Sequence, residues 1–466
     1  MTDSTITIDR PVPSLRVALT TLGCKVNQYD TATITDRLRA EGHTIVPFAD
    51  TADVYIVNSC TVTHQADAES RQLARRAKRH NPDARVVMTG CYAQISPHSV
   101  AKVPEVDYVV GLNRLDDLLR VVSRDTGHER VLVSNLRKPG EVPRVDTLGA
   151  LTFSGQTRAF LKVQEGCDLF CTFCIVPMSR GKSRSVSPRT VLEQLDRLAG
   201  QGFQEVVLTG IHLGGYGEDL DPKVNLVWLL EAIEERKPVP RIRISSLDPH
   251  EISDTFIRVL SQAETLCPHL HVPLQAGDDA VLQRMRRRYD TTLAREVLQQ
   301  VRETLPHASL GTDLIVGFPG EGDSEFAHTL AFLEESPFTY FHVFPYSVRR
   351  GTTAAKFAEK VSQPVIDTRA RRVRQLGEKK KTAFIRSFIG QTLPVLFEHT
   401  RDKNTGLLKG YSRNYLRILA AGSDDYMNRE VPVTIIRTNG ETAWGNICEQ
   451  TPKTAPLSQD SMQMAG

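Results

Sequence analysis

The feature that most constrains the fold is a repeated alternation of short apolar segments with amphipathic helical segments. In the first part of the chain, helical patterns at 27–42, 66–80 and 114–123 separate the apolar segments 16–23, 43–48, 52–59, 85–90 and 106–111. Strands of a parallel sheet are near-continuous apolar runs, and helices connect them. This part therefore predicts an α/β domain with a doubly wound parallel sheet.

The alternation resumes at residue 158 and repeats six times. Strands are expected at 159–164, 205–210, 241–247, 270–275, 313–319 and 340–347, with helical patterns at 188–200, 225–236, 253–262, 278–288, 291–304 and 321–335. Ser187 and Pro188 form a suitable cap and first-turn pair for the first of these helices. Six such units predict a partial (β/α)6 barrel instead of a closed eightfold one.

The β/α alternation does not continue in the rest of the chain. Residues 391–448 contain short strands separated by turns, which is typical of a small all-β barrel. We therefore expect a disordered tail at 1–14, an α/β domain at 15–130, a linker with short strands at 131–155, the partial barrel with a basic helix at 156–386, the all-β barrel at 387–450 and a disordered tail at 451–466.

Composition excludes several classes of protein. Lys plus Arg (58) minus Asp plus Glu (55) gives a net charge of +3, so binding to nucleic acid would depend on local patches. No apolar run approaches the ~18 residues that a membrane span needs, and the first residues lack a secretory signal, so we expect a cytoplasmic protein without a membrane partner. In a reducing compartment, the eight cysteines are expected to bind metal or carry chemistry.

Cys167, Cys171 and Cys174 form a C-x3-C-x2-C motif directly after the first barrel strand. Thiolates clustered this tightly favour an iron–sulfur cluster. Three ligands leave one iron of a four-iron cluster open to the amino and carboxylate groups of S-adenosylmethionine. The alternatives are a zinc site or packed thiols, but structural zinc usually takes a fourth close Cys or His, and none lies nearby in the sequence.

Cys24, Cys60 and Cys91 are widely spaced, but each follows the end of a predicted strand of the first domain. Carboxyl ends of parallel strands lie along one edge of a sheet, where ligands bind. We therefore expect these thiols to converge on a second cluster that also has an open iron. The alternative is three buried cysteines. Packing or local structural roles are expected for Cys267, Cys448, His64, His212, His269 and His271.

At this point the chain resembles a known family. The segment EGCDLFCTFCIVPMSRGKSRS resembles the cluster loop of radical S-adenosylmethionine (SAM) enzymes, and TLGCKVNQYD, NSCTVTHQAD and MTGCYAQ resemble the cysteine blocks of the methylthiotransferases among them. HVPLQAGDDAVLQRMRRRYD and DLIVGFPGE extend the match, and the β segment is similar to a TRAM domain. The residues after Cys24 and Cys60 resemble the branch that modifies N6-threonylcarbamoyladenosine at position 37 of tRNA.

This resemblance implies two 4Fe–4S clusters and two uses of SAM. One SAM gives a methyl group to a sulfur held at the N-terminal cluster, and the other is cleaved at the second cluster to a 5′-deoxyadenosyl radical that takes hydrogen from carbon 2 of the adenine. The implied partners are a tRNA anticodon loop and a flavodoxin- or ferredoxin-like electron donor. Family positions for cofactor contacts are Phe173, Gly210, Ser246, Gln275 and Gly317, at strand ends or beside the cluster cysteines.

Basic residues gather at 71–79, 284–288 and 369–381, and basic and aromatic residues alternate at 409–417. Such stretches neutralise phosphates without reading sequence, although each can also be a solvated helix face, and the β segment could instead brace the barrel. Two alternative reactions remain open, methylthiolation of isopentenyladenosine in tRNA and of a ribosomal protein aspartate. A third alternative is an iron–sulfur RNA-binding protein without turnover.

Overall fold

The computed structural model describes residues 14–123, 129–138 and 156–448, and the chain divides into two compact units, 1–381 and 382–466. Both predicted tails, apart from Ser14, and most of the predicted linker lie outside the described residues. Within these residues, no helix combines the length and the apolar character needed to cross a membrane.

A six-stranded parallel sheet forms the first part of the larger unit, in the order β2-β1-β3-β4-β5-β6. Its strands are β1 (Arg16–Thr21), β2 (Thr44–Val46), β3 (Val54–Ser59), β4 (Arg85–Thr89), β5 (Tyr108–Val110) and β6 (Val131–Leu132). Its helices are α1 (Lys25–Ala40), α2 (His64–His80), α3 (Gly90–Ile95), α4 (Pro97–Ala101) and α5 (Leu115–Ser123).

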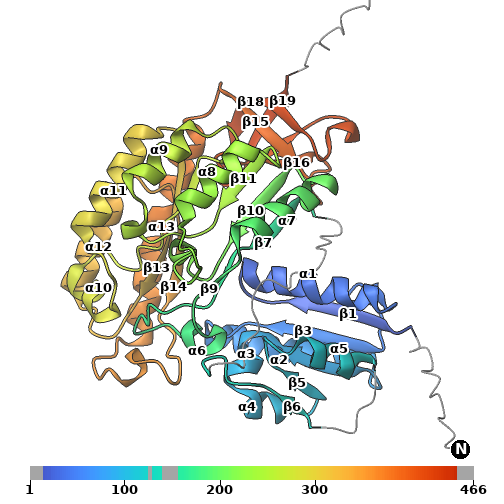
Figure 1. Cartoon of the computed structure of the whole chain (residues 1–466). Helices are drawn as coiled ribbons and strands as arrows, with labels where there is room; N and C mark the ends of the chain where they lie inside the picture. The colour runs from blue at the N-terminus through green and yellow to red at the C-terminus, as the bar shows by residue number, and fades with distance from the viewer. Residues whose placement is uncertain (1–13, 124–128, 139–155, 449–466) are drawn as a thin grey trace, which may run out of the picture. The chain divides into compact units, whose positions relative to one another are not determined.

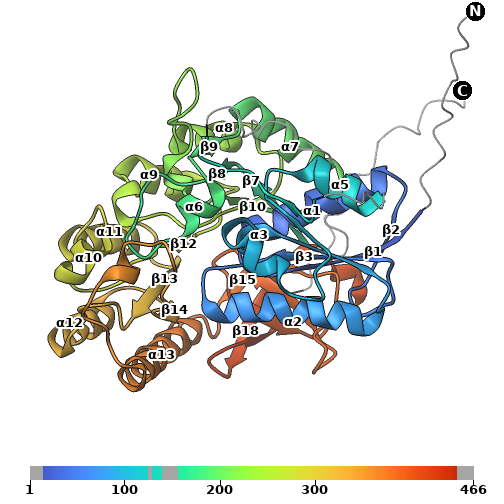
Figure 2. The same cartoon turned by 90° about the horizontal axis from the view of Figure 1, so that it is seen from below.

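Helices cover both faces of this sheet. Side chains of β3 alternate between two apolar clusters: Ile56 packs with Leu38 of α1 and Leu118 of α5, and Tyr55 packs with Ala74 of α2. Figure 2 shows α2 along one face of the sheet and α1 and α5 on the other. The predicted doubly wound sheet is therefore confirmed.

The second part of the larger unit contains parallel strands in the order β7-β10-β11 and β12-β13-β14. An isolated parallel bridge between Ile242 and Leu266 joins the two sets, so they form one curved sheet with helices on its outer side (Figure 1). This arrangement confirms the partial barrel.

The strands of the partial barrel are β7 (Arg158–Lys162), β10 (Glu205–Thr209), β11 (Arg241–Ile244), β12 (His269–His271), β13 (Ser309–Val316) and β14 (Tyr340–Pro345). A small antiparallel pair, β8 (Gln164–Glu165) and β9 (Arg184–Ser185), flanks α6 (Val176–Arg180). The other helices are α7 (Pro188–Gly200), α8 (Leu226–Arg236), α9 (Asp254–Gln262), α10 (Asp279–Met285), α11 (Thr291–Thr304), α12 (Asp323–Glu335) and α13 (Gln363–Arg386). The short 3-10 helices are η1 (Leu213–Gly215), η2 (Pro249–Glu251) and η3 (Ala354–Lys356).

Local chemistry explains where several of these elements begin and end. The Ser187 hydroxyl accepts a hydrogen bond from the Thr190 N–H at 3.2 Å, which confirms the predicted cap of α7. The predicted strand at 270–275 ends at His271, since Pro273 cannot donate to a strand ladder. β13 begins at Ser309, four residues before the predicted start, because its pairing with β12 begins at Ser309 and its pairing with β14 begins at Gly311.

The smaller unit contains a closed barrel with the strand order β15-β16-β17-β19-β18. Its elements are β15 (Thr392–Phe397), β16 (Leu408–Ser412), β17 (Arg417–Ala420), η4 (Asp424–Tyr426), β18 (Glu430–Thr438) and β19 (Ala443–Ile447). Phe397, Ile418 and Val433 are fully buried in its core. The predicted small all-β barrel is therefore confirmed.

Candidate functional site

The C-x3-C-x2-C loop lies between β8 and α6. It begins at Gly166, whose φ is +74° and where a Cβ atom would lie 1.9 Å from the Lys182 carbonyl oxygen, so only glycine fits there. Thr172 fastens the loop to the end of α10, because its N–H donates to the Met285 carbonyl at 3.0 Å and its hydroxyl donates to the Arg284 carbonyl at 2.8 Å. These contacts hold the three cysteines on one short, anchored segment.

The three thiols of this loop lie within electrostatic range of one another. Burial raises the pKa of Cys167 to about 11 and that of Cys174 to about 12, with a smaller contribution from the charge of Cys171 in each case. Two N–H groups point at the sulfurs: the Arg287 guanidinium donates to Cys171 Sγ at 3.2 Å, and the Leu169 amide donates to Cys167 Sγ at 3.5 Å. Converging thiols with N–H donors beside them fit an iron–sulfur cluster.

Cys24, Cys60 and Cys91 come together at the carboxyl edge of the N-terminal sheet. Cys24 precedes α1, Cys60 follows β3, and Cys91 lies in the first turn of α3, directly after β4. Burial raises the pKa of Cys60 to about 11, and the charges of Cys91 and Cys24 add to this rise, so the three thiols lie within electrostatic range of one another. A Cβ atom on Gly23 would lie 2.9 Å from the Cys60 sulfur, so only a residue without a side chain leaves this cradle open.

Asn27, in the first turn of α1, connects the three chain segments that carry these cysteines. Its side-chain N–H groups donate to the Leu22 carbonyl at 2.7 Å and to the Ser59 carbonyl at 3.1 Å, and its Oδ1 lies 4.0 Å from Cys91 Sγ. Asn27 is fully buried. The sequence pattern does not identify Asn27 as a site residue, because its role depends on hydrogen bonds to distant segments.

Arg180 joins the two cysteine groups. It ends α6, six residues after Cys174, and its side chain is only 2% exposed. The guanidinium pairs with Glu165 at 2.8 Å and with Asp30 of α1 at 3.0 Å, and it donates a hydrogen bond to Asn27 Oδ1. Both carboxylates also pair with the Lys162 ammonium at 2.6 Å. Burial raises the pKa of Glu165, but Arg180 and Lys162 outweigh burial and hold it well below the ordinary range.

A cavity of about 190 Å³ lies beside Cys174 and Phe173. Gln275, Asp313 and Phe344 line its barrel side, and Val62 and Thr63 from the N-terminal domain line another part of it. The cavity therefore touches both the three-cysteine loop and the segment that follows Cys60. This is the arrangement that two cluster sites acting on one substrate require.

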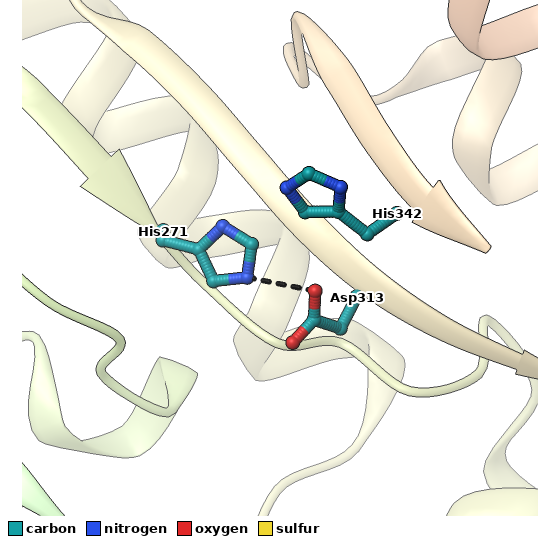
Figure 3. Close-up of side chains that lie close together, drawn as sticks. All are labelled: His271, Asp313 and His342. Carbon is teal, nitrogen blue, oxygen red and sulfur yellow. Dashed lines mark ion pairs between the residues drawn. The ribbon is translucent and has the colours of Figure 1, made fainter. Parts of the chain in front are cut away.

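Polar side chains from three neighbouring strands meet inside the partial barrel. His271 Nε2 lies 2.9 Å from Asp313 Oδ1, and the imidazole of His342 faces both groups (Figure 3). Burial and, next, the charge of Arg243 lower the pKa of the half-buried Lys25 to about 8. Lys25 thus lies in the same region, although it comes from α1 of the N-terminal domain. Sequence reasoning missed Lys25, Asp313 and His342 as site residues.

The other predicted cofactor-contact positions, cysteines and histidines lie in varied surroundings. Gln275 has a φ of +68° and lines the cavity, whereas Ser246 is exposed. Gly317 has a φ of +76° and a Cβ atom there would lie 2.3 Å from Ile366, so it is a tight-turn glycine, and Gly210 packs against Gln164. The remaining cysteines and histidines lie as follows: Cys267 is buried, Cys448 contacts Thr434, His64 begins α2, His212 pairs with Glu251, and His269 stacks on Tyr340.

The basic stretches divide into paired and exposed residues. Arg287 pairs with Asp248 and donates to Cys171, and Arg369 is buried against Glu321 at 2.8 Å, so the side chains of these two arginines are already engaged within the protein. In the β barrel, Arg413 pairs with Glu430 at 2.9 Å, and the rings of Tyr411 and Tyr415 stack 5.0 Å apart. The stretches are therefore only partly available to phosphates.

One prediction concerns Gly90, which precedes Cys91 with a φ of +91°. A Cβ atom there would lie 2.4 Å from the Ser59 carbonyl oxygen, so Gly90→Ala must displace the turn that carries Cys91. We expect a loss of about 1–3 kcal/mol of unfolding free energy, together with lower iron content after anaerobic reconstitution. Gly202→Ala is the matched control, because it measures the cost of placing alanine at a positive φ without a steric clash. Gly202 has a φ of +86°, and a Cβ atom there would have no other atom within 4 Å. Equal iron content in the two variants would contradict the prediction.

Comparisons with known proteins agree with this geometry. Residues 16–111 match the family model described as Uncharacterized protein family UPF0004, and residues 161–333 match that of the Radical SAM superfamily. The radical SAM methyltransferase TsrM of Kitasatospora setae shares the fold, with a TM-score of 0.54 and 17% identity over 72% of this chain and 75% of that one. The fold and the three-cysteine loop therefore define a radical SAM protein, a class that uses a 4Fe–4S cluster and S-adenosylmethionine.

The curated relatives identify the family within this class. The chain is 40% identical to the threonylcarbamoyladenosine tRNA methylthiotransferase MtaB of Bacillus subtilis, over 90% of this chain and 94% of the relative, and 41% identical to that of Aquifex aeolicus, over 82% and 92%. It is 30% identical to the tRNA-2-methylthio-N(6)-dimethylallyladenosine synthase of Pelotomaculum thermopropionicum, over 89% and 93%. The chain belongs to the radical SAM methylthiotransferase family, which confirms the family predicted from the cysteine blocks.

Proposed function

We propose that this protein methylthiolates carbon 2 of N6-threonylcarbamoyladenosine at position 37 of tRNA. The observation that carries the proposal is the similarity to enzymes named for this reaction, at 34–41% identity over most of the chain. The dimethylallyladenosine enzymes, at 28–30% identity, represent the weaker alternative. We expect the anticodon loop to be the part of the tRNA that binds, a flavodoxin- or ferredoxin-like protein to supply electrons, and the cytoplasm to be the compartment.

The cysteines are assigned to two clusters. Cys167, Cys171 and Cys174 hold the 4Fe–4S cluster that binds S-adenosylmethionine, with Phe173, Gly210, Ser246, Gln275 and Gly317 as cofactor-contact positions. Cys24, Cys60 and Cys91 hold a second 4Fe–4S cluster. The support is the convergence of each set of thiols and the cavity that reaches both neighbourhoods. When bound, the clusters and S-adenosylmethionine supply the radical and the methylthio group for an aromatic C–H bond that acid–base groups cannot activate.

The protein's own residues then have separable tasks. The loop anchored by Thr172 and the cradle at Gly23 fix the two sets of thiols. Arg180 and Asn27 hold one set relative to the other through hydrogen bonds. Phe173 and Phe344 supply apolar lining to the cavity beside Cys174. Positioning and shielding of this kind are what radical chemistry demands of a protein.

The test is the nucleoside profile of tRNA from a strain that lacks this gene and has no redundant enzyme. We expect 2-methylthio-N6-threonylcarbamoyladenosine to disappear, its unmethylthiolated precursor to accumulate, and the wild-type gene to restore the product. Mass spectrometry of digested tRNA measures both nucleosides. Persistence of the methylthio nucleoside would refute the substrate assignment, and loss of the methylthio dimethylallyl nucleoside instead would favour the weaker alternative. An intact profile together with no 5′-deoxyadenosine from the purified protein would favour the non-catalytic RNA-binding alternative.

A further inference from the structure

The interior of the partial barrel contains a group of cationic and hydrogen-bonding side chains that the proposed chemistry does not use. The group consists of Lys25 from α1, Arg243 from β11, His271 from β12 and His342 from β14, with the carboxylate of Asp313 among them. Figure 3 shows the two imidazole rings and Asp313 converging from three adjacent strands. We refer to these five residues as the lumen group.

Positive charge is in excess within the lumen group. Arg243 forms a two-pronged pair with Glu205 at 2.9 and 3.1 Å, but the same carboxylate also pairs with Arg241 at 2.8 Å. Asp313 is engaged by His271 at 2.9 Å. In the part of the chain that the structure describes, no side chain forms an ion pair or hydrogen bond with the Lys25 ammonium. A half-buried cation without such a partner is suited to an anionic ligand.

The lumen group lies next to the reaction space. Asp313 belongs to it and also lines the cavity beside Cys174 and Phe173. Lys25 is the first residue of α1 and directly follows Cys24, the N-cap. Its side chain therefore leaves the backbone next to a cysteine of the proposed second cluster. An adenine placed in the cavity would thus have the lumen group within reach of a substituent on its ring.

The chemistry of the proposed substrate supplies the anion. A threonylcarbamoyl group carries a free carboxylate and a hydroxyl, whereas a dimethylallyl group is an uncharged hydrocarbon. We propose that the lumen group binds the carboxylate of the threonylcarbamoyl substituent, with Lys25 as the main ionic contact and His342 as a hydrogen-bond donor. This inference rests on the proposed function and adds the residues that select the substrate. A site built for a polar group discriminates strongly against an analogue that lacks it.

A divalent metal is the competing occupant. His271, Asp313 and His342 each offer one ligand atom within 4.8 Å of the others, a set that could hold a metal ion. The charge of Lys25 lowers the pKa of His342, and the charges of Arg243 and Lys25 both lower the pKa of the neighbouring His269, after burial in each case. Two nearby cations disfavour a divalent metal and favour a carboxylate, so the observations support the substrate.

Binding experiments can separate these possibilities without turnover. The probe is a short anticodon stem-loop RNA with N6-threonylcarbamoyladenosine at position 37, compared with the same RNA whose threonyl carboxylate is a methyl ester. Fluorescence anisotropy under anaerobic conditions, with reconstituted protein, measures both affinities. We expect the wild type to bind the acid about tenfold more tightly than the ester, and Lys25→Met to lose this preference while keeping its affinity for the ester.

Two further variants keep the test decisive. His342→Gln changes a residue of β14, a strand that carries no cysteine, and we expect it to reduce the preference for the acid by about threefold even if Lys25→Met loses iron. Lys223→Met, an exposed lysine in a loop, is the matched control and should keep the full preference. An unchanged preference in both lumen variants would overturn the inference, and so would a stoichiometric metal other than iron that His342→Gln removes.

Failure of the inference and failure of the proposed function give different results. If the substrate assignment is wrong, the wild type binds the threonylcarbamoyl RNA no better than unmodified RNA and forms no methylthio product from it. If only the inference is wrong, the wild type converts the threonylcarbamoyl RNA but binds acid and ester equally.

Discussion

Replacement of Cys60 by alanine is expected to separate two activities that the wild-type protein carries out together. Cys60 belongs to the N-terminal thiols, whereas cleavage of S-adenosylmethionine is assigned to the loop of Cys167, Cys171 and Cys174. We therefore expect Cys60→Ala to form 5′-deoxyadenosine in the presence of dithionite but no methylthio product. Its iron content should fall from about eight to about four atoms per chain, since each four-iron cluster depends on its own ligands.

Cys171→Ala is the complementary variant. It should form neither 5′-deoxyadenosine nor product, because the loop loses one of the three thiols assigned to the cluster that binds S-adenosylmethionine. Cys267→Ala is the matched control, since Cys267 is buried in the partial barrel outside both groups, and it should retain both activities. Chromatography of the deoxyadenosine and nucleoside mass spectrometry measure the two outcomes. Full product formation by Cys60→Ala would remove the second cluster from the mechanism.

Replacement of Arg180 by methionine should cause the largest loss of stability among the changes considered. The guanidinium lies between Glu165 and Asp30, and only Lys162 would remain to balance these two carboxylates. Breaking a buried ionic network from one side costs about 3–5 kcal/mol, because an uncompensated charge remains in a poorly solvated position. We expect this loss in the free energy of unfolding from chemical denaturation.

Two comparison variants sharpen the Arg180 experiment. Arg189→Met breaks a pair of an exposed arginine with Glu193 on the surface of α7, and it should leave stability unchanged. Arg180→Lys keeps one positive charge but loses the two-pronged geometry. Its free energy of unfolding should therefore lie between those of the wild type and Arg180→Met. If Arg180→Met is as stable as Arg189→Met, the network does not support the packing of the two domains. A normal iron content in a destabilised Arg180→Met would limit its role to stability.

Element order was predictable because apolar periodicity is local. The expected helix at 291–304 matches α11, and the expected strand at 85–90 differs from β4 by one residue. Errors arose where tertiary pairing extends or shortens an element. Residues 309–312 contain one apolar residue and gave no strand signal, yet pairing with β12 from Ser309 and with β14 from Gly311 lengthens β13. Likewise, α1 begins directly after Cys24, which places Lys25 and Asn27 in its first turn.

The cysteines were predictable for a different reason. A thiol that follows the end of a parallel strand must lie at the carboxyl edge of the sheet, so three of them share that edge whatever the details of packing. The partners of these thiols had no comparable signal. Asn27 and Arg180 are 153 residues apart, and both stood inside the motif blocks without an assigned role. Only the packing of α1 against β7 and of α3 against α6 brings them into contact.

The sequence alone thus determined the β/α order of both α/β domains, the all-β end of the chain and the two sets of cysteines, because each depends on local periodicity or on position along a strand. The tertiary structure decided how the two sets are joined through Arg180, and which side chains surround the reaction space. Lys25 reaches the barrel interior from another domain, and His342 becomes its neighbour because β14 borders β13. Such contacts depend on how distant segments pack, and that information is distributed over the whole core instead of any one segment.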